Sequence, residues 1–388
     1  MMLGYLLARA GVEVMVLEKH GDFFRDFRGD TIHPSTLELL HELGILADFL
    51  KLPHQTAETI GGHIGNFMFT AADFRHLPTQ CKFIAFAPQW DFLNFLADHA
   101  KRHAPFHLKM EHEVTDLIRE GKRVVGVRAN TPQGPVEVMA DLVVGADGRS
   151  SRVREQSGLK VKDLGAPFDV LWFRLSQKET DPHQSLGNFG AGRAMVMINR
   201  KDYWQCGYLI AKGQFDRIKD KGLAAFHRNI AELVPVLQDR VAELNAWDQI
   251  KLLTVQVNRL QRWHLPGLLC IGDAAHAMSP VGGVGINLAI QDAVAAANIL
   301  ATPLRDKTAD EDTLAHVQMR REWPTQATQA AQVFLQNKFL FKILSAQGPM
   351  KPPLIAWLLA HFPILRRIPA YLIGVGVRPE HVETAEVK

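Results

Sequence analysis

The sequence predicts an α/β fold in which a β-rich unit interrupts the α/β core and a helical region closes the chain. Three observations predict it. The chain opens with a helix pattern and a short apolar strand, within 1–17. A second apolar strand, 267–271, runs through a turn into a long alanine-rich helix. Between them, 164–210 alternates apolar and polar residues as half-buried strands do.

These patterns divide the chain into three units, two of which are discontinuous. The α/β unit takes 1–60, 85–160 and 255–305, the β-rich unit takes 61–84 and 161–254, and 306–388 forms the helical region. Because the β-rich segments are inserted between α/β segments, we expect the units to be interleaved along the chain.

Composition and charge exclude several classes of protein. The 388 residues are 47% hydrophobic and 22% charged, which is typical of a globular chain long enough for several units. A net charge of +3 lacks the basic excess of a nucleic-acid binder. Cys81, Cys206 and Cys270 are too few and too far apart for a disulfide framework or a CxxC metal site. We therefore expect no metal, no nucleic acid and a reducing, cytoplasmic location.

The first predicted strand ends at an acidic residue. The helix pattern of 1–10 stops at Gly11, a favourable C-cap, and the strand 12–17 is followed by Glu18. In a dinucleotide-binding βαβ unit, a carboxylate at this point binds a ribose, about 20 residues after a G-x-G-x-x-G turn. That turn would lie immediately before Met1, so we expect a Rossmann-like unit whose first strand and glycine turn are absent from this sequence. An ordinary helix–strand pair with a surface glutamate is the alternative.

A second segment, DLVVGADGRSSRVR at 141–154, places Asp147 between glycines after a buried strand. Gly145 and Gly148 let the backbone approach a ligand closely, and the carboxylate can accept hydrogen bonds. Taken alone, an ordinary Asp-Gly turn explains the same residues.

The most specific pattern is LLCIGDAAHAMSPVGGVGINLAIQ, at 268–291. A strand delivers Gly272 and Asp273 to a turn, and a glycine-rich loop then leads into a helix that starts near Ile286. A helix N-terminus offers unpaired N–H groups and the positive end of the helix dipole to an anionic or electron-rich ligand. The loop glycines leave room for a flat ring.

Taken together, GADGRSSRVR and the later GDAAHAMSPVGGVGIN resemble the p-hydroxybenzoate-hydroxylase-type (group A) flavoprotein monooxygenases, which are FAD-dependent aromatic hydroxylases, here N-terminally truncated. The resemblance implies these contacts with FAD: Glu18 with the adenosine ribose, Arg28 with the pyrophosphate region, Gln89 with the flavin nucleotide, Asp147 in a segment shared with NAD(P)H, Asp273 with the ribityl and pyrophosphate region, and the backbone of Pro280, Gly283, Gly285, Ile286 and Asn287 with the pyrimidine end of the ring. It also implies that His276 and Asp292 are structural.

The resemblance implies a monooxygenase that uses NAD(P)H and O2 and acts through a flavin C4a-hydroperoxide on an aromatic or other electron-rich hydrophobic substrate. The β-rich unit would cover the substrate side, with Trp172, Phe173, Tyr203 and Trp204 as candidate walls. Residue spacing selects no catalytic base, no substrate and neither NADH nor NADPH. A homodimer is common in this family and is left open.

Besides flavin enzymes of the same scaffold that reduce double bonds, epoxidise or halogenate, two alternatives are open. The apolar segment 352–377, interrupted by two prolines and by Arg366 and Arg367, predicts two short helices. These either pack on the protein or lie on a membrane surface, and the second case would favour a lipid- or quinone-like substrate. The other alternative is a truncated, non-catalytic homologue unable to hold FAD. We expect instead that the natural start lies upstream of Met1.

Overall fold

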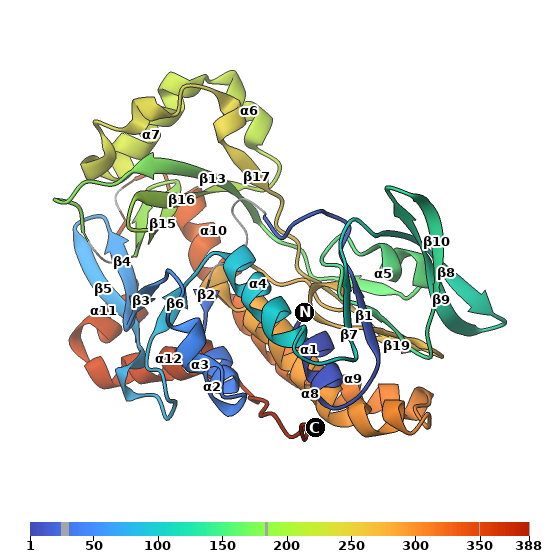
Figure 1. Cartoon of the computed structure of the whole chain (residues 1–388). Coiled ribbons are helices and arrows are strands. Elements are labelled where there is room, and N and C mark those ends of the chain that lie inside the picture. Colours follow the sequence, from blue (N-terminus) through green and yellow to red (C-terminus); the bar gives the residue numbers. More distant parts are fainter. Residues whose placement is uncertain (25–30, 183–184, 349, 388) are drawn as a thin grey trace.

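A computed structural model describes residues 1–24, 31–182, 185–348 and 350–387. It confirms the predicted fold class, since short parallel strands and long helices form an α/β core and a separate large sheet lies above that core (Figure 1).

The parallel strands of the α/β core form two separate sheets. β1 (Val14–Leu17) pairs with β7 (Phe106–Lys109). β11 (Val143–Gly145) pairs in parallel with β20 (Leu268–Cys270), and β19 (His264–Leu265) extends that second sheet. Among the strands of the described residues, none joins β1 to β11, and a cavity lined by both strands lies between them.

Four helices pack on these strands, namely α1 (Met2–Arg9), α4 (Gln89–Ala100), α8 (Gly285–Arg305) and α9 (Glu311–Leu335). α1 contacts α4 and α8, and α8 contacts α9. Gly4 lets α1 approach β1 closely, because a Cβ at this position would lie 2.8 Å from Val16 Cγ2.

The helix α8 is the centre of the core. Within the described part of the chain, Val281–Arg305 is the one helical stretch long and apolar enough to cross a membrane by length and composition. The same helix buries most of its residues inside the protein, including Val294, Ala296 and Leu300, which are fully covered. Burial inside the protein accounts for its apolar composition.

Several further helices and strands complete the fold. α2 (Pro34–Glu42) and α3 (Leu46–Phe49) are separate helices, because Gly44 between them adopts φ +72° and ends the first. The remaining elements are β2 (Thr31–Ile32), β3 (Gln55–Ala57), β6 (Ile84–Phe86), β8 (Glu113–Glu120), β9 (Arg123–Thr131), β10 (Gly134–Met139), α5 (Arg152–Ser157), β12 (Val161–Asp163) and β18 (Asn258–Leu260). β8, β9 and β10 form an antiparallel sheet of their own.

The large sheet has seven strands, drawn from two distant parts of the sequence. In spatial order they are β17 (Lys251–Leu253), β13 (Phe168–Ser176), β16 (Tyr203–Ala211), β15 (Arg193–Asn199), β14 (Leu186–Gly190), β4 (Thr59–Ile64) and β5 (Phe67–Asp73). β4 pairs with β14 in parallel, and the other neighbours are antiparallel. Helices α6 (Phe215–Asp220) and α7 (Leu223–Leu233) cover the outer face of this sheet (Figure 1).

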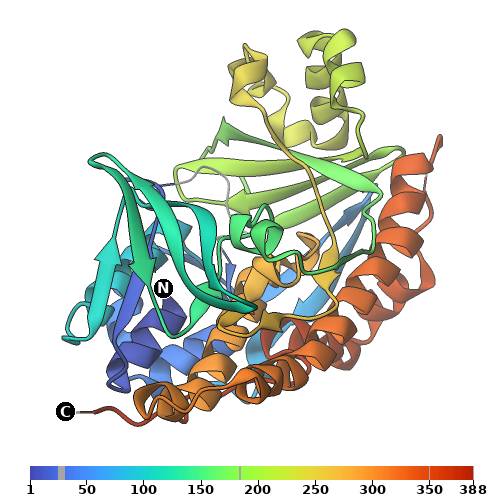
Figure 2. The ribbon, with the colours of Figure 1, turned by 90° about the vertical axis from the view of Figure 1, so that its right-hand side faces the viewer.

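The C-terminal region is helical, as the sequence predicts. After α9 come a π-helical turn, Gln336–Leu340, and α10 (Phe341–Ser345). The two short helices expected within 352–377 are α11 (Leu354–His361) and α12 (Arg367–Gly374), and both pack against β5. Figure 2 shows the end of α9 and α10, in orange-red, along one edge of the molecule, running from the core up to the large sheet.

Candidate active site

The site is one large cavity between the α/β core and the large sheet. Its volume of about 2740 Å³ exceeds the roughly 300–1,000 Å³ of a usual small-molecule pocket. It therefore has room for a dinucleotide together with a substrate. The predicted site residues that line it are Glu18, Gln89, Asp147, Asp273, Pro280, Gly283, Gly285 and Ile286. Arg28 lies outside the described residues.

Glu18 lies at the cavity immediately after β1. Its backbone N–H donates to the carbonyl oxygen of Lys109, which continues the pairing of β1 with β7 by one residue. The backbone N–H of His20 donates to Glu18 Oε1 at 3.0 Å. The strand therefore fixes the backbone of Glu18, and the following turn orients its carboxylate beside the cavity.

Asp147 stabilises the turn that carries it. Its Oδ1 accepts a hydrogen bond from Ser151 Oγ at 2.5 Å, and its Oδ2 accepts one from the backbone N–H of Val153 at 3.1 Å. Ser151 in turn caps α5 by accepting from the backbone N–H of Arg154. The carboxylate thus fixes the loop that faces the cavity, a structural contribution that the sequence motif did not reveal.

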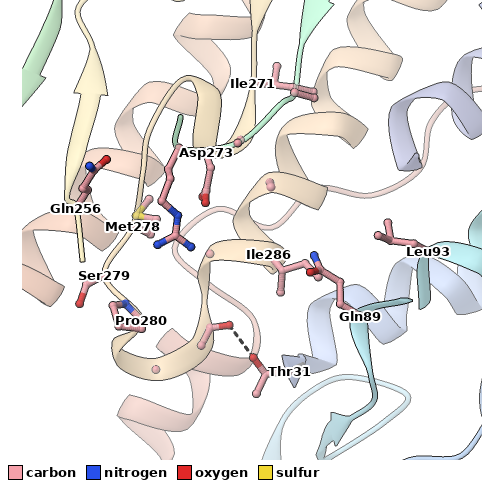
Figure 3. Close-up of a pocket in the computed structure, with 18 of the residues that line it drawn as sticks. Thr31, Gln89, Leu93, Gln256, Ile271, Asp273, Met278, Ser279, Pro280 and Ile286 are labelled. Atoms are coloured by element: carbon pink, nitrogen blue, oxygen red, sulfur yellow. Dashed lines mark hydrogen bonds between the residues drawn. The ribbon is translucent and has the colours of Figure 1, made fainter. Parts of the chain in front are cut away.

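Asp273 lies in the turn Gly272–Ala274, between β20 and α8. A Cβ placed on Gly285 would be 3.9 Å from Asp273 Oδ1, so the carboxylate lies beside the first turn of α8. Figure 3 shows Asp273, Met278 and Pro280 along this connection, with Gln89 and Leu93 of α4 on another side of the cavity.

A buried ionic network holds the Asp273 turn. Asp292 of α8 is fully buried and accepts from the backbone N–H of Gly272 at 3.0 Å and from Arg321 Nε at 3.0 Å, and its Oδ2 lies 2.5 Å from His276 Nε2. Burial alone would raise the pKa of Asp292, but His276, Arg321 and the Gly272 N–H together lower it. Both His276 and Asp292 are structural in this arrangement, as expected.

The glycine loop before α8 is fixed to a segment far away in the sequence. Thr31 Oγ1 donates to the carbonyl oxygen of Gly283 at 2.9 Å, the contact drawn in Figure 3. Gly283 has φ +63°, and a Cβ there would lie 2.4 Å from Thr31 Oγ1, so this position requires glycine. The loop and the first turn of α8 thereby present backbone groups to the cavity.

Asn287 does not line the cavity. Its side chain is buried, where Oδ1 accepts from the backbone N–H of His33 at 2.9 Å and from Thr36 Oγ1 at 2.7 Å. Its Nδ2 donates to the carbonyl oxygen of Thr31 at 3.0 Å. Asn287 therefore joins α8 to the start of α2, and only its backbone remains a candidate for a ligand contact.

His33 is a buried partner of the same junction. Burial lowers its pKa to about 4, against the smaller raising effect of a contact between Nδ1 and the carbonyl oxygen of Ile373 at 2.7 Å. Its ring is therefore neutral at physiological pH, and Nδ1 donates to that carbonyl.

The side of the cavity formed by the large sheet is apolar. One face of β13 contributes Phe168, Val170 and Trp172 to the lining, which confirms Trp172 as a wall. The expectation for Phe173 and Trp204 is wrong. Both are buried in the core on the opposite face, towards α7, because side chains alternate across a strand. Tyr203 does not line the cavity either, and the Arg174 guanidinium lies over its ring.

Sequence reasoning missed the part that the C-terminal helices take in the site. Ile355 of α11 and Ile368 and Leu372 of α12 line the cavity, as do Phe334 and Lys338. The apolar composition of this segment indicated that its helices pack against an apolar surface. The spacing of its residues does not show which strand a helix packs against.

These residues fit a flavin dinucleotide. An acidic residue follows a parallel strand, a helix N-terminus opens into the cavity, and the loop before it is so close-packed that Gly283 admits no side chain. Within the described residues, no group of three or more His, Cys, Asp or Glu side chains is placed to hold a metal ion.

Comparison with known proteins identifies the family. The model of a family described as FAD binding domain matches residues 1–331. The chain is 31% identical over 382 residues to 6-methylpretetramide 4-monooxygenase of Streptomyces rimosus, covering 94% of this chain and 88% of that protein.

Solved structures agree in fold. p-Nitrophenol 4-monooxygenase PnpA from Pseudomonas putida DLL-E4 gives a TM-score of 0.77 at 18% identity, covering 97% of this chain and 95% of that one. P. aeruginosa PqsL in complex with 2-aminobenzoylacetate gives 0.75 at 20% identity, covering 89% and 94%. The structural likenesses show the fold, and the match to the FAD binding domain over 1–331 shows the family. This chain belongs to the FAD-dependent aromatic monooxygenases.

Proposed function

We propose that the protein uses FAD, NAD(P)H and O2 to hydroxylate a multi-ring aromatic substrate. The observation that supports this most is the single cavity that has the polar start of α8 on one side and the apolar face of the large sheet on another. A flavin ring held at the polar side would face a substrate held against the apolar side.

The chain's own groups have distinct tasks in this proposal. The N-terminus of α8 places N–H groups and a positive dipole end where negative charge develops on a reduced ring. Asp273 and Glu18 bind hydroxyl groups of the dinucleotide. Apolar side chains such as Phe168 and Phe339 exclude water from the substrate. FAD, when bound, supplies the redox chemistry, taking electrons from NAD(P)H and activating oxygen for transfer.

The name of the relative at 31% identity supports a substrate of several rings. The relative at 31% identity is named for 6-methylpretetramide, and the structural neighbour PqsL was solved with 2-aminobenzoylacetate. We infer that phenols with several fused rings bind better than one-ring phenols.

Product analysis tests this function. Flavin-loaded protein is supplied with NADH or NADPH, isotopically labelled oxygen gas, and phenols of one, two and four fused rings. The expected result is substrate-stimulated oxidation of one nicotinamide and one labelled oxygen atom in the product of a larger phenol. Asp273→Ala should lose flavin binding, and Asp248→Asn, an exposed carboxylate in the outer layer, should not. Bound flavin together with no labelled product from any phenol would contradict the proposal.

We also propose a cytoplasmic location. Cys81, Cys206 and Cys270 are buried free thiols, which supports a reducing compartment. Fractionation of cells that produce the protein tests it, and recovery from an oxidising compartment would contradict it.

A further inference from the structure

The charges of the chain are divided unequally. Residues 323–379 contain six lysines and arginines and no aspartate or glutamate, so this segment carries +6. The whole chain carries +3, and the remainder therefore carries −3. The cations are Lys338, Lys342, Lys351, Arg366, Arg367 and Arg378. A basic segment on an otherwise weakly acidic protein indicates an anionic partner.

The same segment exposes large apolar side chains. We call Leu354, Ile355, Trp357, Ile364, Ile368 and Leu372 the C-terminal apolar face. Their exposed fractions run from 43% for Trp357 to 71% for Leu354. The small residues Ala356 and Ala370 of α11 and α12 are buried instead, on the side that packs against the protein. Exposed apolar side chains gathered on α11, α12 and the turn Pro363–Arg366 between them mark an interaction surface.

The cations beside this face are not neutralised by the protein's own acids. Among the ion pairs of the described residues, none uses Lys338, Lys342, Lys351 or Arg367. Arg366 donates to the carbonyl oxygens of Leu359 at 2.6 Å and Ala360 at 2.7 Å, and this contact holds the turn between α11 and α12. The positive charge of this region is therefore available to a partner.

The C-terminal apolar face continues into the cavity. Ile355, Ile368 and Leu372 are at once exposed and part of the cavity lining. The cation Lys338 also borders the cavity. The opening between these helices and the large sheet is thus apolar with a basic margin.

We propose that the C-terminal apolar face and its cations dock the protein on an anionic lipid bilayer, with the cavity opening towards the lipid. Tryptophan, leucine and isoleucine beside lysine and arginine are the side chains that bury shallowly in a bilayer interface and attract anionic headgroups. A second copy of the chain is a poorer occupant, because it would bring a second +6 segment against the first.

Docking has a consequence for catalysis that rests on the proposed function. An apolar multi-ring substrate dissolved in the bilayer would enter the cavity past Ile368 and Leu372 without crossing water. Vesicles containing the substrate should then lower its apparent KM relative to the same substrate in detergent-free buffer.

Vesicle flotation tests the docking itself. Flavin-loaded protein is mixed with vesicles of phosphatidylcholine, with or without phosphatidylglycerol, at low and high salt. Binding is expected on vesicles that contain phosphatidylglycerol and should weaken at high salt. Failure to float with either vesicle would overturn the proposal. So would equal binding to both, or a dimer that needs the same residues and leaves no vesicle binding.

Two paired variants give the test its controls. Lys342→Gln with Arg367→Gln should weaken vesicle affinity roughly 25-fold, at about fivefold for each charge lost. Lys122→Gln with Lys221→Gln removes the same charge elsewhere on the surface and should leave affinity unchanged. Leu354→Ser with Ile364→Ser should also weaken binding, whereas Val161→Ser with Val236→Ser, at exposed positions of other elements, should not.

Catalysis in vesicle-free buffer separates the two proposals. None of the substituted residues lines the cavity, so each variant should keep its flavin spectrum and its turnover of a soluble phenol. Normal turnover without vesicle binding would overturn docking and leave the proposed function standing. Vesicle binding without turnover would overturn the proposed function and leave docking standing.

Discussion

At the scale of single residues, buried carboxylates hold distant segments together. Asp292 joins the Gly272 turn to Arg321, and Arg321 Nη1 donates to Glu380 at 2.9 Å near the end of the chain. In the large sheet, Asp181 accepts from Arg240 Nη2 at 3.0 Å and from Trp204 Nε1 at 2.8 Å. Each carboxylate is compensated by several donors, and removing one would leave a buried arginine without its partner.

Acid should remove the contribution of Asp181 to the stability of the folded protein. Burial alone would raise its pKa, but the hydrogen bonds from Arg240 and Trp204 lower the pKa to about 2. A carboxyl group with a lowered pKa stabilises the folded state at every pH above its ordinary pKa, which is near 4. This stabilisation is lost as the pH falls through 2. The stability difference between wild type and Asp181→Asn should therefore be constant from pH 5 to pH 8 and shrink by about 2 kcal/mol towards pH 2.

Urea unfolding at a series of pH values measures that difference. Asp248→Asn, which removes an exposed carboxylate in the same layer, is the matched control and should show no such change. A wild-type advantage over Asp181→Asn that is the same at pH 2 and pH 7 would refute the assignment.

Gly283 should be necessary for flavin binding. Alanine at this position meets both an unfavourable φ of +63° and Thr31 Oγ1 at 2.4 Å, so the loop before α8 must shift. We expect Gly283→Ala to weaken FAD affinity at least about tenfold, which corresponds to 1.4 kcal/mol. Gly213→Ala has a similar φ of +72° with open space around the added Cβ, so it should cost stability only. Fluorescence titration with FAD compares the two, and equal affinities would contradict the prediction.

At the scale of elements, the large sheet has two functional faces. One face of β13 presents Phe168, Val170 and Trp172 to the cavity, and the other presents Leu171 and Phe173 to the core beneath α7. Both faces are apolar, because one binds substrate in our proposal and the other is covered by helices. For that reason the sequence pattern located the strand without showing which of its faces lines the cavity.

Adjacent aromatic residues should therefore give different phenotypes. Trp172→Ala should raise KM for the aromatic substrate with a modest effect on stability, because its ring is only partly buried. Phe173→Ala should lower stability by about 3–5 kcal/mol and leave the KM of the folded fraction unchanged, since its ring packs edge-on against Phe226 at 5.7 Å. Steady-state kinetics and thermal unfolding measure both variants, and matching KM values would contradict the assignment of faces.

Local motifs and long-range contacts differed in how far they could be predicted. Glu18, Asp273 and the Gly283 loop were located from the sequence because each depends on a strand end or helix start a few residues away. The contact of Thr31 with Gly283 joins positions far apart in the chain, and no local pattern encodes it. The same holds for the ion pair of Arg321 with Glu380, because the sequence around either residue does not show which residue it pairs with.

At the scale of the whole molecule, one cavity borders the α/β core, the large sheet and the C-terminal helices. β1, β11, the start of α8, the large sheet and the C-terminal helices all contribute to its lining. The C-terminal tail packs back on the first helix, where the backbone N–H of Val387 donates to the carbonyl oxygen of Arg9 in α1. A ligand that fills this cavity would touch both β1 and β11, which do not pair with each other directly.

FAD should therefore stabilise the molecule as a whole. Binding to the folded state alone contributes about 2.7 kcal/mol when free FAD is at 100 times its Kd. Because the cavity separates the β1–β7 sheet from the β11–β20 sheet, FAD should slow amide hydrogen exchange in both and at the start of α8. α7 packs on the far face of the large sheet, so its exchange should change least. Protection confined to one of the two parallel sheets would show that FAD does not bridge them, and would place the dinucleotide elsewhere in the cavity.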